Sequence, residues 1–183
     1  MALKTFILEN SSTKKQRQSD IQKSVREFLN NPKAKVVYDE KGRPSVENVE
    51  KKVNISITCC GKVMLLVIFE KAIGIDGEHL PSVIDPEKKI DYIQLAERFF
   101  SYDEVEYLRD SARETEGENF VNIWVRKEAY IKAAGKTVAE FPNFSVVDGS
   151  RFVKKIHNIS IKRFAIKFPE CEDYIFAIAG NID

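Results

Sequence analysis

The amino-acid sequence predicts an α+β fold with antiparallel sheets, made of two related α/β halves that meet near residue 72. Three observations lead to this prediction. Near the N-terminus, a helical segment precedes several strand-like runs. Two of these runs, residues 52–60 and 62–69, are separated by Gly61 and predict a hairpin. Beyond residue 72 the order is strand, helices and strands again.

The first half is predicted to open with a short strand within residues 1–10, followed by a helix. Apolar residues at helical spacing indicate the helix, Ser19 or Asp20 is its expected N-cap, and Pro32 ends it. A further short strand is predicted over residues 35–38. The second hairpin strand, KVMLLVIF, is apolar throughout and is expected to be buried on both faces. The apolar helix positions are Ile21, Val25, Phe28 and Leu29.

The second half is predicted to begin with a strand at residues 72–76. Three helices follow, and Gly135 terminates the last of them. Three strands complete this half. The predicted helices span residues 90–100, 103–114 and 119–134, and the predicted strands span residues 151–157, 158–168 and 174–179.

Composition indicates a globular protein and argues against several classes of partner. The chain has 183 residues, of which 43 % are hydrophobic, enough for a substantial core. Its 29 basic and 28 acidic residues give a net charge of +1, which argues against binding to nucleic acid or to a membrane surface over the whole molecule. No apolar run approaches the roughly 18 residues of a membrane span. Three cysteines without CxxC spacing favour a reduced protein in the cytoplasm.

Two carboxylates stand at the end of a predicted strand in the segment AIGIDGEH. Side chains alternate along a strand, so Gly74, Asp76 and Glu78 share one face if the strand continues. Two acids that converge on one spot repel each other unless a cation lies between them. Mg²⁺ prefers such oxygen ligands and commonly binds substrate phosphates as well. A metal site is one interpretation of this segment, and an ordinary acidic turn after a strand is the other.

A third carboxylate lies in NIWVRKEAYIKAAGK, residues 122–136. At about 100° per residue, Glu128 points toward the apolar side of the predicted helix, and Lys132 lies one turn further on. A buried carboxylate needs a partner, because an unpaired one costs several kcal/mol. A solvated pair of Glu128 with Lys132, worth roughly 0.3 to 0.5 kcal/mol, is the simpler alternative.

Taken together, GIDGE (residues 74–78) and WVRKEAYIKAAGK (residues 124–136) resemble the two signature motifs of the 4′-phosphopantetheinyl transferase superfamily. Between them, AERFFSYDE resembles a segment of the surfactin-synthetase-activating type, which has two halves, and its Glu104 is a candidate metal ligand or base. Upstream, GRPS and ISITCCG resemble the GKP turn and the NISHSG strand of the same type. The resemblance covers residue 41 to about residue 136.

The resemblance implies that the 4′-phosphopantetheine arm of coenzyme A (CoA) is transferred to a serine hydroxyl of an acyl or peptidyl carrier protein, with release of adenosine 3′,5′-bisphosphate. It implies Mg²⁺ held by the residues that match the motif acids, Asp76, Glu78 and Glu128. Glu128 would also take the serine proton, directly or through a metal-bound water. Lys132 would neutralise the leaving phosphate, and Lys127 is a weaker candidate for the same contact. Asp76, Glu128 and Lys132 are thus the implied catalytic residues.

Further residues are implied to bind CoA. Arg43 and Thr58 are candidates for the 3′-phosphate, because a guanidinium fork and a hydroxyl both suit phosphate oxygens. Cys59 occupies the position of the family's histidine and is a poorer hydrogen-bond donor. The N-terminal region is shorter than in the surfactin type, so the basic residues of SSTKKQRQ are candidates to replace missing CoA contacts.

The resemblance also implies an architecture of two halves related by a pseudo-twofold axis, with CoA in the cleft between them. The halves would comprise residues 1–71, the abbreviated half, and residues 72–183, and such a chain would act as a monomer. Cys59 and the short N-terminal region leave a second interpretation open, a relative that binds CoA or a carrier protein without transfer. A small nucleic-acid-binding protein that uses residues 14–17 is a third, and the balanced charge argues against it.

Overall fold

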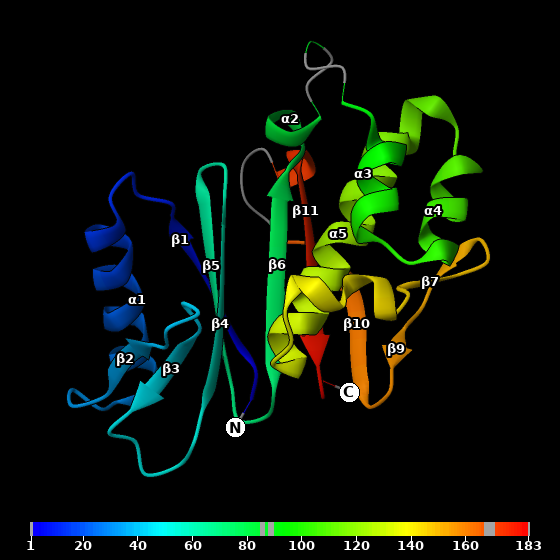
Figure 1. Cartoon of the computed structure of the whole chain (residues 1–183). Coiled ribbons are helices and arrows are strands. Elements are labelled where there is room, and N and C mark those ends of the chain that lie inside the picture. The colour runs from blue at the N-terminus through cyan, green and yellow to red at the C-terminus, as the bar shows by residue number, and fades with distance from the viewer. Residues whose placement is uncertain (1, 85–86, 88–89, 167–170, 183) are drawn as a thin grey trace.

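The computed structural model describes residues 2–84, 87, 90–166 and 171–182. It confirms an α+β fold in which the strand pairs of the described residues are antiparallel. Two sheets face each other near the middle of the molecule, and helices cover their outer faces (Figure 1).

The N-terminal sheet consists of β1 (Lys4–Glu9), β5 (Val63–Phe69) and β4 (Asn54–Cys60), in that order. The predicted hairpin is confirmed, because β4 pairs with β5 across Gly61, whose φ of 49° suits glycine. Every residue of β5 is buried, as predicted. Its side chains alternate: Leu65 packs toward the second sheet, whereas Leu66 packs toward the helix on the other face.

Helix α1 (Lys14–Leu29) covers the outer face of this sheet beside a small hairpin of β2 (Lys35–Tyr38) and β3 (Pro44–Glu47). The predicted start of this helix was wrong. Thr13 is the N-cap, because its side chain accepts a hydrogen bond from the Gln16 amide at 3.2 Å. The first turns are polar and lie on the surface, so they carry no apolar periodicity that would mark them as helical.

The second sheet has the strand order β6 (Ile73–His79), β11 (Tyr174–Gly180), β10 (Ile159–Phe164) and β9 (Lys155–Ile156). Strand β6 runs three residues beyond the predicted end and so carries both acids of its motif. In the N-terminal sheet, β1 pairs with β5, and β5 pairs with β4. In the second sheet, β6 likewise pairs with β11, the last strand of the chain, and β11 pairs with β10. The two sheets therefore share a strand order.

Helix α5 (Arg113–Ala134) lies across the second sheet and packs on β6 and β11. Gly135 terminates it in the left-handed conformation, as predicted. Its start and the end of the preceding helix differ from the prediction, since the chain turns after Asp110 and restarts as α5 at Arg113. The predicted strand over residues 151–157 is broken into two short strands, and residues 167–168 of the next prediction lie outside the described residues. The remaining elements are α2 (Leu80–Val83), α3 (Tyr92–Phe99), α4 (Tyr102–Arg109), the 3₁₀ helices η2 (Val138–Asn143) and η3 (Cys171–Asp173), β7 (Val147–Asp148) and β8 (Arg151–Phe152).

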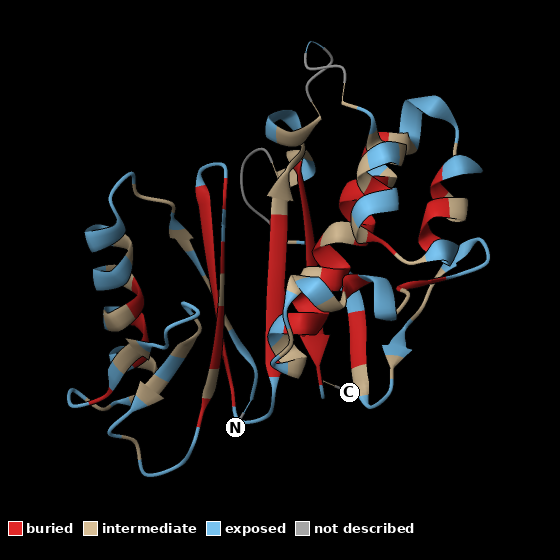
Figure 2. Cartoon of the chain, viewed as in Figure 1, coloured by how far each residue is buried: buried red, intermediate tan, exposed pale blue. Residues whose placement is uncertain are grey.

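The core consists of three apolar clusters (Figure 2). One lies beneath α1, one between the two sheets, and the largest between α5, the smaller helices and the second sheet. The middle cluster brings β4 and β6 together, so side chains of the two sheets meet along these strands. None of the helices in the described part of the chain is long and apolar enough to cross a membrane.

Gly74 allows β6 and α5 to approach each other closely. A Cβ atom at this position would lie 2.1 Å from the Ala129 carbonyl oxygen and 2.6 Å from the Ala133 amide nitrogen. Both atoms belong to the helix backbone, which cannot move aside as a flexible side chain can. The glycine of the GID motif therefore sets the spacing between the strand that carries Asp76 and the helix that carries Glu128.

Substitution Gly74→Ala is expected to lower the free energy of unfolding by about 1–3 kcal/mol, because the added methyl group overpacks this contact. Denaturant unfolding followed by circular dichroism measures the change. Ser150→Ala, at an exposed turn, is the control and should leave the unfolding midpoint within error of the native protein. An unchanged midpoint for Gly74→Ala would contradict the close approach of strand and helix.

Candidate active site

Asp76 is the most buried of the three predicted metal ligands, with 6 % of its surface exposed. Its Oδ1 accepts hydrogen bonds from Lys132 Nζ at 2.6 Å and from Thr58 Oγ1 at 3.1 Å. Its Oδ2 is enclosed and accepts no hydrogen bond of normal geometry. Burial raises the pKa of Asp76, and Lys132, Thr58 and the Gly77 amide oppose that shift. One oxygen of a buried carboxylate is thus left without a partner.

Glu78 and Glu128 interact electrostatically with Asp76. Burial is the main cause that raises the pKa of Glu78 to about 7, and the charges of Asp76 and Glu128 add to it. Burial and Asp76 also raise the pKa of Glu128. Lys132 opposes both shifts. Three carboxylates from β6 and α5 therefore share one electrostatic environment around a single ammonium group.

The raised pKa of Glu78 predicts a pH dependence of stability for the protein without divalent metal. The folded state holds this proton up to about pH 7, whereas the unfolded chain releases it near 4.5. The folded state thus binds more protons between these values, so Glu78 favours folding most below pH 4.5, and this contribution is lost as the pH rises through 7. Glu78→Gln should therefore become more stable relative to the native protein between pH 5 and pH 8. Denaturant titrations measure this trend, and parallel pH profiles for the two proteins would contradict it.

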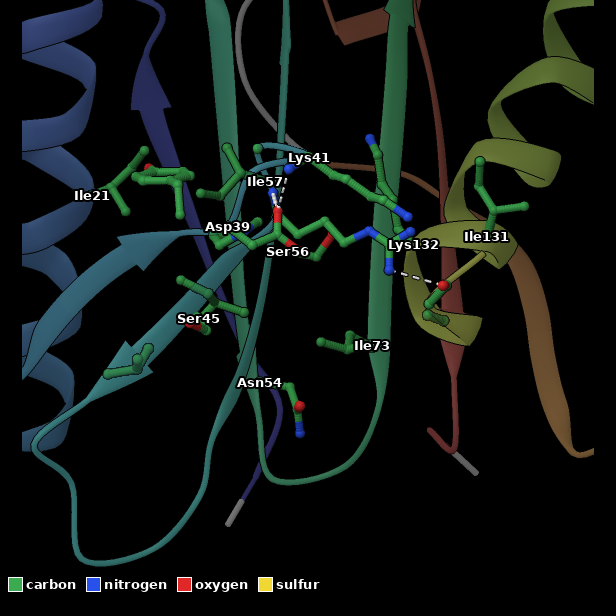
Figure 3. A pocket seen from close by; sticks show the side chains of 18 of the residues that line it. Ile21, Asp39, Lys41, Ser45, Asn54, Ser56, Ile57, Ile73, Ile131 and Lys132 are labelled. Atoms are coloured by element: carbon green, nitrogen blue, oxygen red, sulfur yellow. Dashed lines mark hydrogen bonds between the residues drawn. The ribbon is translucent and has the colours of Figure 1, made fainter. Parts of the chain in front are cut away.

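A large cleft lies between the N-terminal sheet and the end of α5 (Figure 3). Glu128 is one of the residues that line it. The volume of the cleft is about 1180 Å³, and its walls come from α1, the β2–β3 hairpin, β4 and the C-terminal end of α5. Three acids line it, Asp39, Glu40 and Glu128, against seven basic side chains. A cleft of this size and charge suits an extended anion that carries several phosphates. The basic residues are Lys14, Arg17, Lys41, Arg43, Lys52, Lys132 and Lys136.

Arg43 joins the β2–β3 hairpin to the end of α5 across the cleft. Its guanidinium donates to the Gly135 carbonyl at 2.8 Å and to the Lys136 carbonyl at 3.0 Å. These carbonyls are at the helix C-terminus, where a cation is favourable. The side chain lines the cleft, as its predicted contact with CoA requires, and two of its donors are already in use.

Thr58 and Cys59 point to opposite sides of β4. Thr58 is buried and donates to Asp76, so the structure assigns it a partner other than the 3′-phosphate contact expected from the sequence. Cys59 is exposed and lines the cleft. Burial raises the pKa of Cys59, while Arg17 and Lys132 oppose the shift. The charge of Arg17, on the N-terminal helix, thus lowers the pKa of Cys59, which occupies the position of histidine in the resembled family.

The sequence model of the 4′-phosphopantetheinyl transferase superfamily matches residues 72–179, more than half of the chain. This range contains both acids of β6 and both Glu128 and Lys132 of α5. The chain belongs to the 4′-phosphopantetheinyl transferase superfamily.

Curated relatives agree with this family. The chain is 30 % identical over 118 residues to the 4′-phosphopantetheinyl transferase gsp of Aneurinibacillus migulanus, which covers 63 % of the chain and 45 % of that protein. Identity to psf-1 of Bacillus pumilus is 27 % over 117 residues, covering 63 % of the chain and 46 % of the relative. Identity to HetI of Nostoc sp. (strain PCC 7120) is 30 % over 112 residues, covering 60 % and 45 %. The matches thus extend over a little less than half the length of each relative.

Within this transferase-superfamily chain, Lys127 does not lie in the cleft. Its side chain is fully buried, and its Nζ donates to both carboxylate oxygens of Glu104, at 2.8 and 2.7 Å, and to the Phe144 carbonyl at 2.6 Å. The predicted contact of Lys127 with CoA is therefore wrong in this structure. Glu104 is equally buried and also accepts from the Val146 amide at 2.8 Å, so it is not available as a metal ligand or base either.

Two further residues shape the site and were missed from the sequence. Asp39 accepts hydrogen bonds from the amides of Lys41 and Arg43, at 2.9 and 2.8 Å, and so shapes the loop that carries Arg43. An aspartate before a KGRP turn is the signal that would have found it. Ser56 accepts a hydrogen bond from the Ile75 amide at 3.0 Å and links β4 to β6 beside Asp76. Its position two residues before Thr58 places it on the same strand face, which does not specify a partner on β6.

The site residues fit a hard divalent cation in the chemistry of their donors. Asp76 Oδ2 is an enclosed oxygen without a partner, and two further carboxylates interact with it electrostatically. Across residues 2–84, 87, 90–166 and 171–182, however, no three His, Cys, Asp or Glu side chains already stand in a metal-binding arrangement. Lys132 currently neutralises Asp76.

Proposed function

We propose that this protein transfers the 4′-phosphopantetheine arm of CoA to a serine hydroxyl of an acyl or peptidyl carrier protein and releases adenosine 3′,5′-bisphosphate. The observation that carries the proposal is the ion pair between Asp76 and Lys132, because Lys132 lies on the wall of a cleft that holds seven basic residues. An anion with three phosphates would lie among these cations with its diphosphate near the acids. The family match over residues 72–179 and the names of the matched transferases support the same reaction.

Asp76, Glu78 and Glu128 would hold Mg²⁺, which would neutralise negative charge on the diphosphate when bound. Lys132 lies at the same place and would neutralise the leaving phosphate once it is released from Asp76. Glu128 would take the proton of the attacking serine, and burial raises its pKa above that of an ordinary carboxyl group, which makes it a stronger base. The serine oxygen forms a bond to the phosphorus next to the pantetheine arm, and the bond from that phosphorus to the bridging oxygen breaks. The proton then resides on Glu128, and the bridging oxygen leaves with the adenosine bisphosphate.

The acids stand between two cavities of opposite character, which supports a reaction between two different substrates. Glu128 lines the basic cleft, whereas Glu78 lines a second cavity of about 250 Å³. This second cavity is apolar, and we assign it to a side chain of the carrier protein next to the reacting serine. The carrier would then approach from the side opposite the CoA cleft. Besides Glu78 it is lined by Val83, Leu95, Phe99, Phe120, Val121 and Trp124.

We also propose that residues 1–71 and 72–183 form two halves related by a pseudo-twofold axis and that the chain acts as a monomer. The shared strand order of the two sheets supports the relation between the halves. The cleft between the halves already contains basic residues from both, which supports a site built by a single chain. Sedimentation with and without CoA tests the monomer.

The experiment for the proposed function is incubation of the full chain with CoA, Mg²⁺ and a panel of apo carrier proteins. Mass spectrometry is expected to show the phosphopantetheine arm on at least one carrier, and omission of Mg²⁺ should abolish transfer.

The second candidate function is that of a relative that binds CoA or a carrier without transfer. One observation favours it: Asp76 Oδ1 already accepts hydrogen bonds from Lys132 and Thr58. It predicts CoA binding by calorimetry with no modified carrier under any condition.

A further inference from the structure

Arg126 is a buried cation without an ionic partner, on the side of α5 that faces away from the cleft. Only 8 % of its surface is exposed. Its Nε is enclosed and has no hydrogen-bond acceptor. Among the described residues, no carboxylate forms an ion pair with it. Buried charges are normally paired, because removing a charge from water without compensation is costly.

The surroundings of Arg126 compensate its charge only in part. Its guanidinium lies over the Phe152 ring, 4.2 Å from the ring centre, which is an attractive contact that supplies no hydrogen-bond acceptor. Tyr107, which packs on the same ring at 5.5 Å, favours the charged form, whereas Arg163 disfavours it. Burial is the main cause that lowers the pKa of Arg126 to about 10. The group nevertheless remains a cation at neutral pH.

Arg163 places a second guanidinium nearby on β10. Half of its side chain is exposed, and its one ion pair in the described part of the chain is a 3.8 Å contact with Glu118. Glu118 is equally exposed, so this pair contributes little. Residues 149–166, which contain both β8 and β10, carry five Lys or Arg and no acid. This face is therefore locally basic although the net charge of the chain is only +1.

We propose that Arg126 and Arg163 form a binding site for a phosphate-type oxyanion on the face made by α5, β8 and β10. In Figure 1, α4 and β10 lie on the side of α5 opposite to β6. The site is therefore separate from the cleft. Two guanidinium groups bind one oxyanion well, because each offers several N–H donors in a planar fork. Nε of Arg126 is enclosed, so its terminal nitrogens take the anion. The ligand is either free phosphate or a phosphoryl group on a larger molecule.

The test measures thermal unfolding of the full chain with inorganic phosphate, against sodium chloride of equal ionic strength. Phosphate at about ten times its Kd is expected to raise Tm by about 3 °C. Arg126→Met, which keeps an apolar chain over Phe152, should lose most of this shift, and so should Arg163→Met on the surface. Arg151→Met, on the exposed neighbouring strand, is the matched control and should retain it. O-Phosphoserine in a parallel series distinguishes a phosphoryl group from free phosphate, since equal shifts indicate that only the phosphate is recognised.

The cleft is also basic, so Arg17→Met, which changes only the cleft, separates the two sites. A phosphate shift that is lost in Arg17→Met and kept in Arg126→Met and Arg163→Met would place the anion in the cleft and overturn the proposal. No shift in the native protein would overturn it as well. If Arg126→Met fails to fold, Arg163→Met with its Arg151→Met control decides the question. In the native protein, phosphate should also move the NMR signal of the Arg126 Nε–H group.

Discussion

Glu128→Gln is expected to reduce the rate of phosphopantetheine transfer by about 100-fold or more while the fold is retained. Glutamine has nearly the same shape, but it cannot ionise and cannot accept the serine proton. It also removes one of the three oxygen ligands proposed for Mg²⁺. The carboxylate is half-buried next to Asp76 and Lys132, so its replacement by a neutral amide leaves no unpaired buried charge. Initial rates at saturating CoA and Mg²⁺, followed by mass spectrometry of the carrier, measure this reduction in the transfer rate.

The matched control for this variant is Glu114→Gln, an exposed residue in the first turn of the same helix. It should retain the native rate. Calorimetry with CoA distinguishes a loss of chemistry from a loss of binding, since Glu128→Gln is expected to bind CoA in the cleft still. A Glu128→Gln protein that transfers at the native rate would refute the role assigned to this residue. A native protein that binds CoA but modifies no carrier would instead refute the proposed reaction.

Lys127→Met is expected to lower the free energy of unfolding by about 3–5 kcal/mol. It removes the cation from a fully buried pair, so the carboxylate of Glu104 keeps only its hydrogen bonds from backbone amides such as those of Ser101 and Val146. Burial lowers the pKa of Lys127 to about 8, and Glu104 opposes the shift. An intact buried ion pair commonly contributes little net stability, whereas removing one partner is costly because it leaves an uncompensated charge. Denaturant unfolding measures the change.

The double variant with Glu104→Gln should recover part of the lost stability, because it also removes the uncompensated buried charge. This experiment also separates the structural role of Lys127 from the role expected from the sequence. If Lys127 bound CoA, the Lys127→Met substitution would raise the Kd for CoA and leave the unfolding midpoint unchanged. That outcome would restore the original expectation and contradict the buried pair.

The sequence predicted the elements well where an apolar pattern runs along a single segment. Strand β5 is an uninterrupted apolar run between two layers, and the glycine after α5 marks its end by a local backbone requirement. Prediction failed for the start of α1, because its first turns are solvated and their capping residue, Thr13, resembles any other threonine in a polar stretch. Helix boundaries near residue 111 failed for a similar reason, since the sequence is polar on both sides of the turn.

The candidate site shows the same division. By itself, the sequence determined that Asp76 and Glu78 share a strand face and that Glu128 and Lys132 lie one helical turn apart, because these relations follow from the repeat of a single element. Only the tertiary structure decided that Lys132 forms an ion pair with Asp76, whereas Lys127 is buried in an ion pair with Glu104. It also decided that Thr58 donates a hydrogen bond to Asp76. Whether a lysine on a helix meets water, a ligand or a carboxylate depends on residues far away in the chain that pack against its side of the helix. The physical reason is that burial and charge pairing are set by these long-range contacts, which the local pattern of residues does not contain.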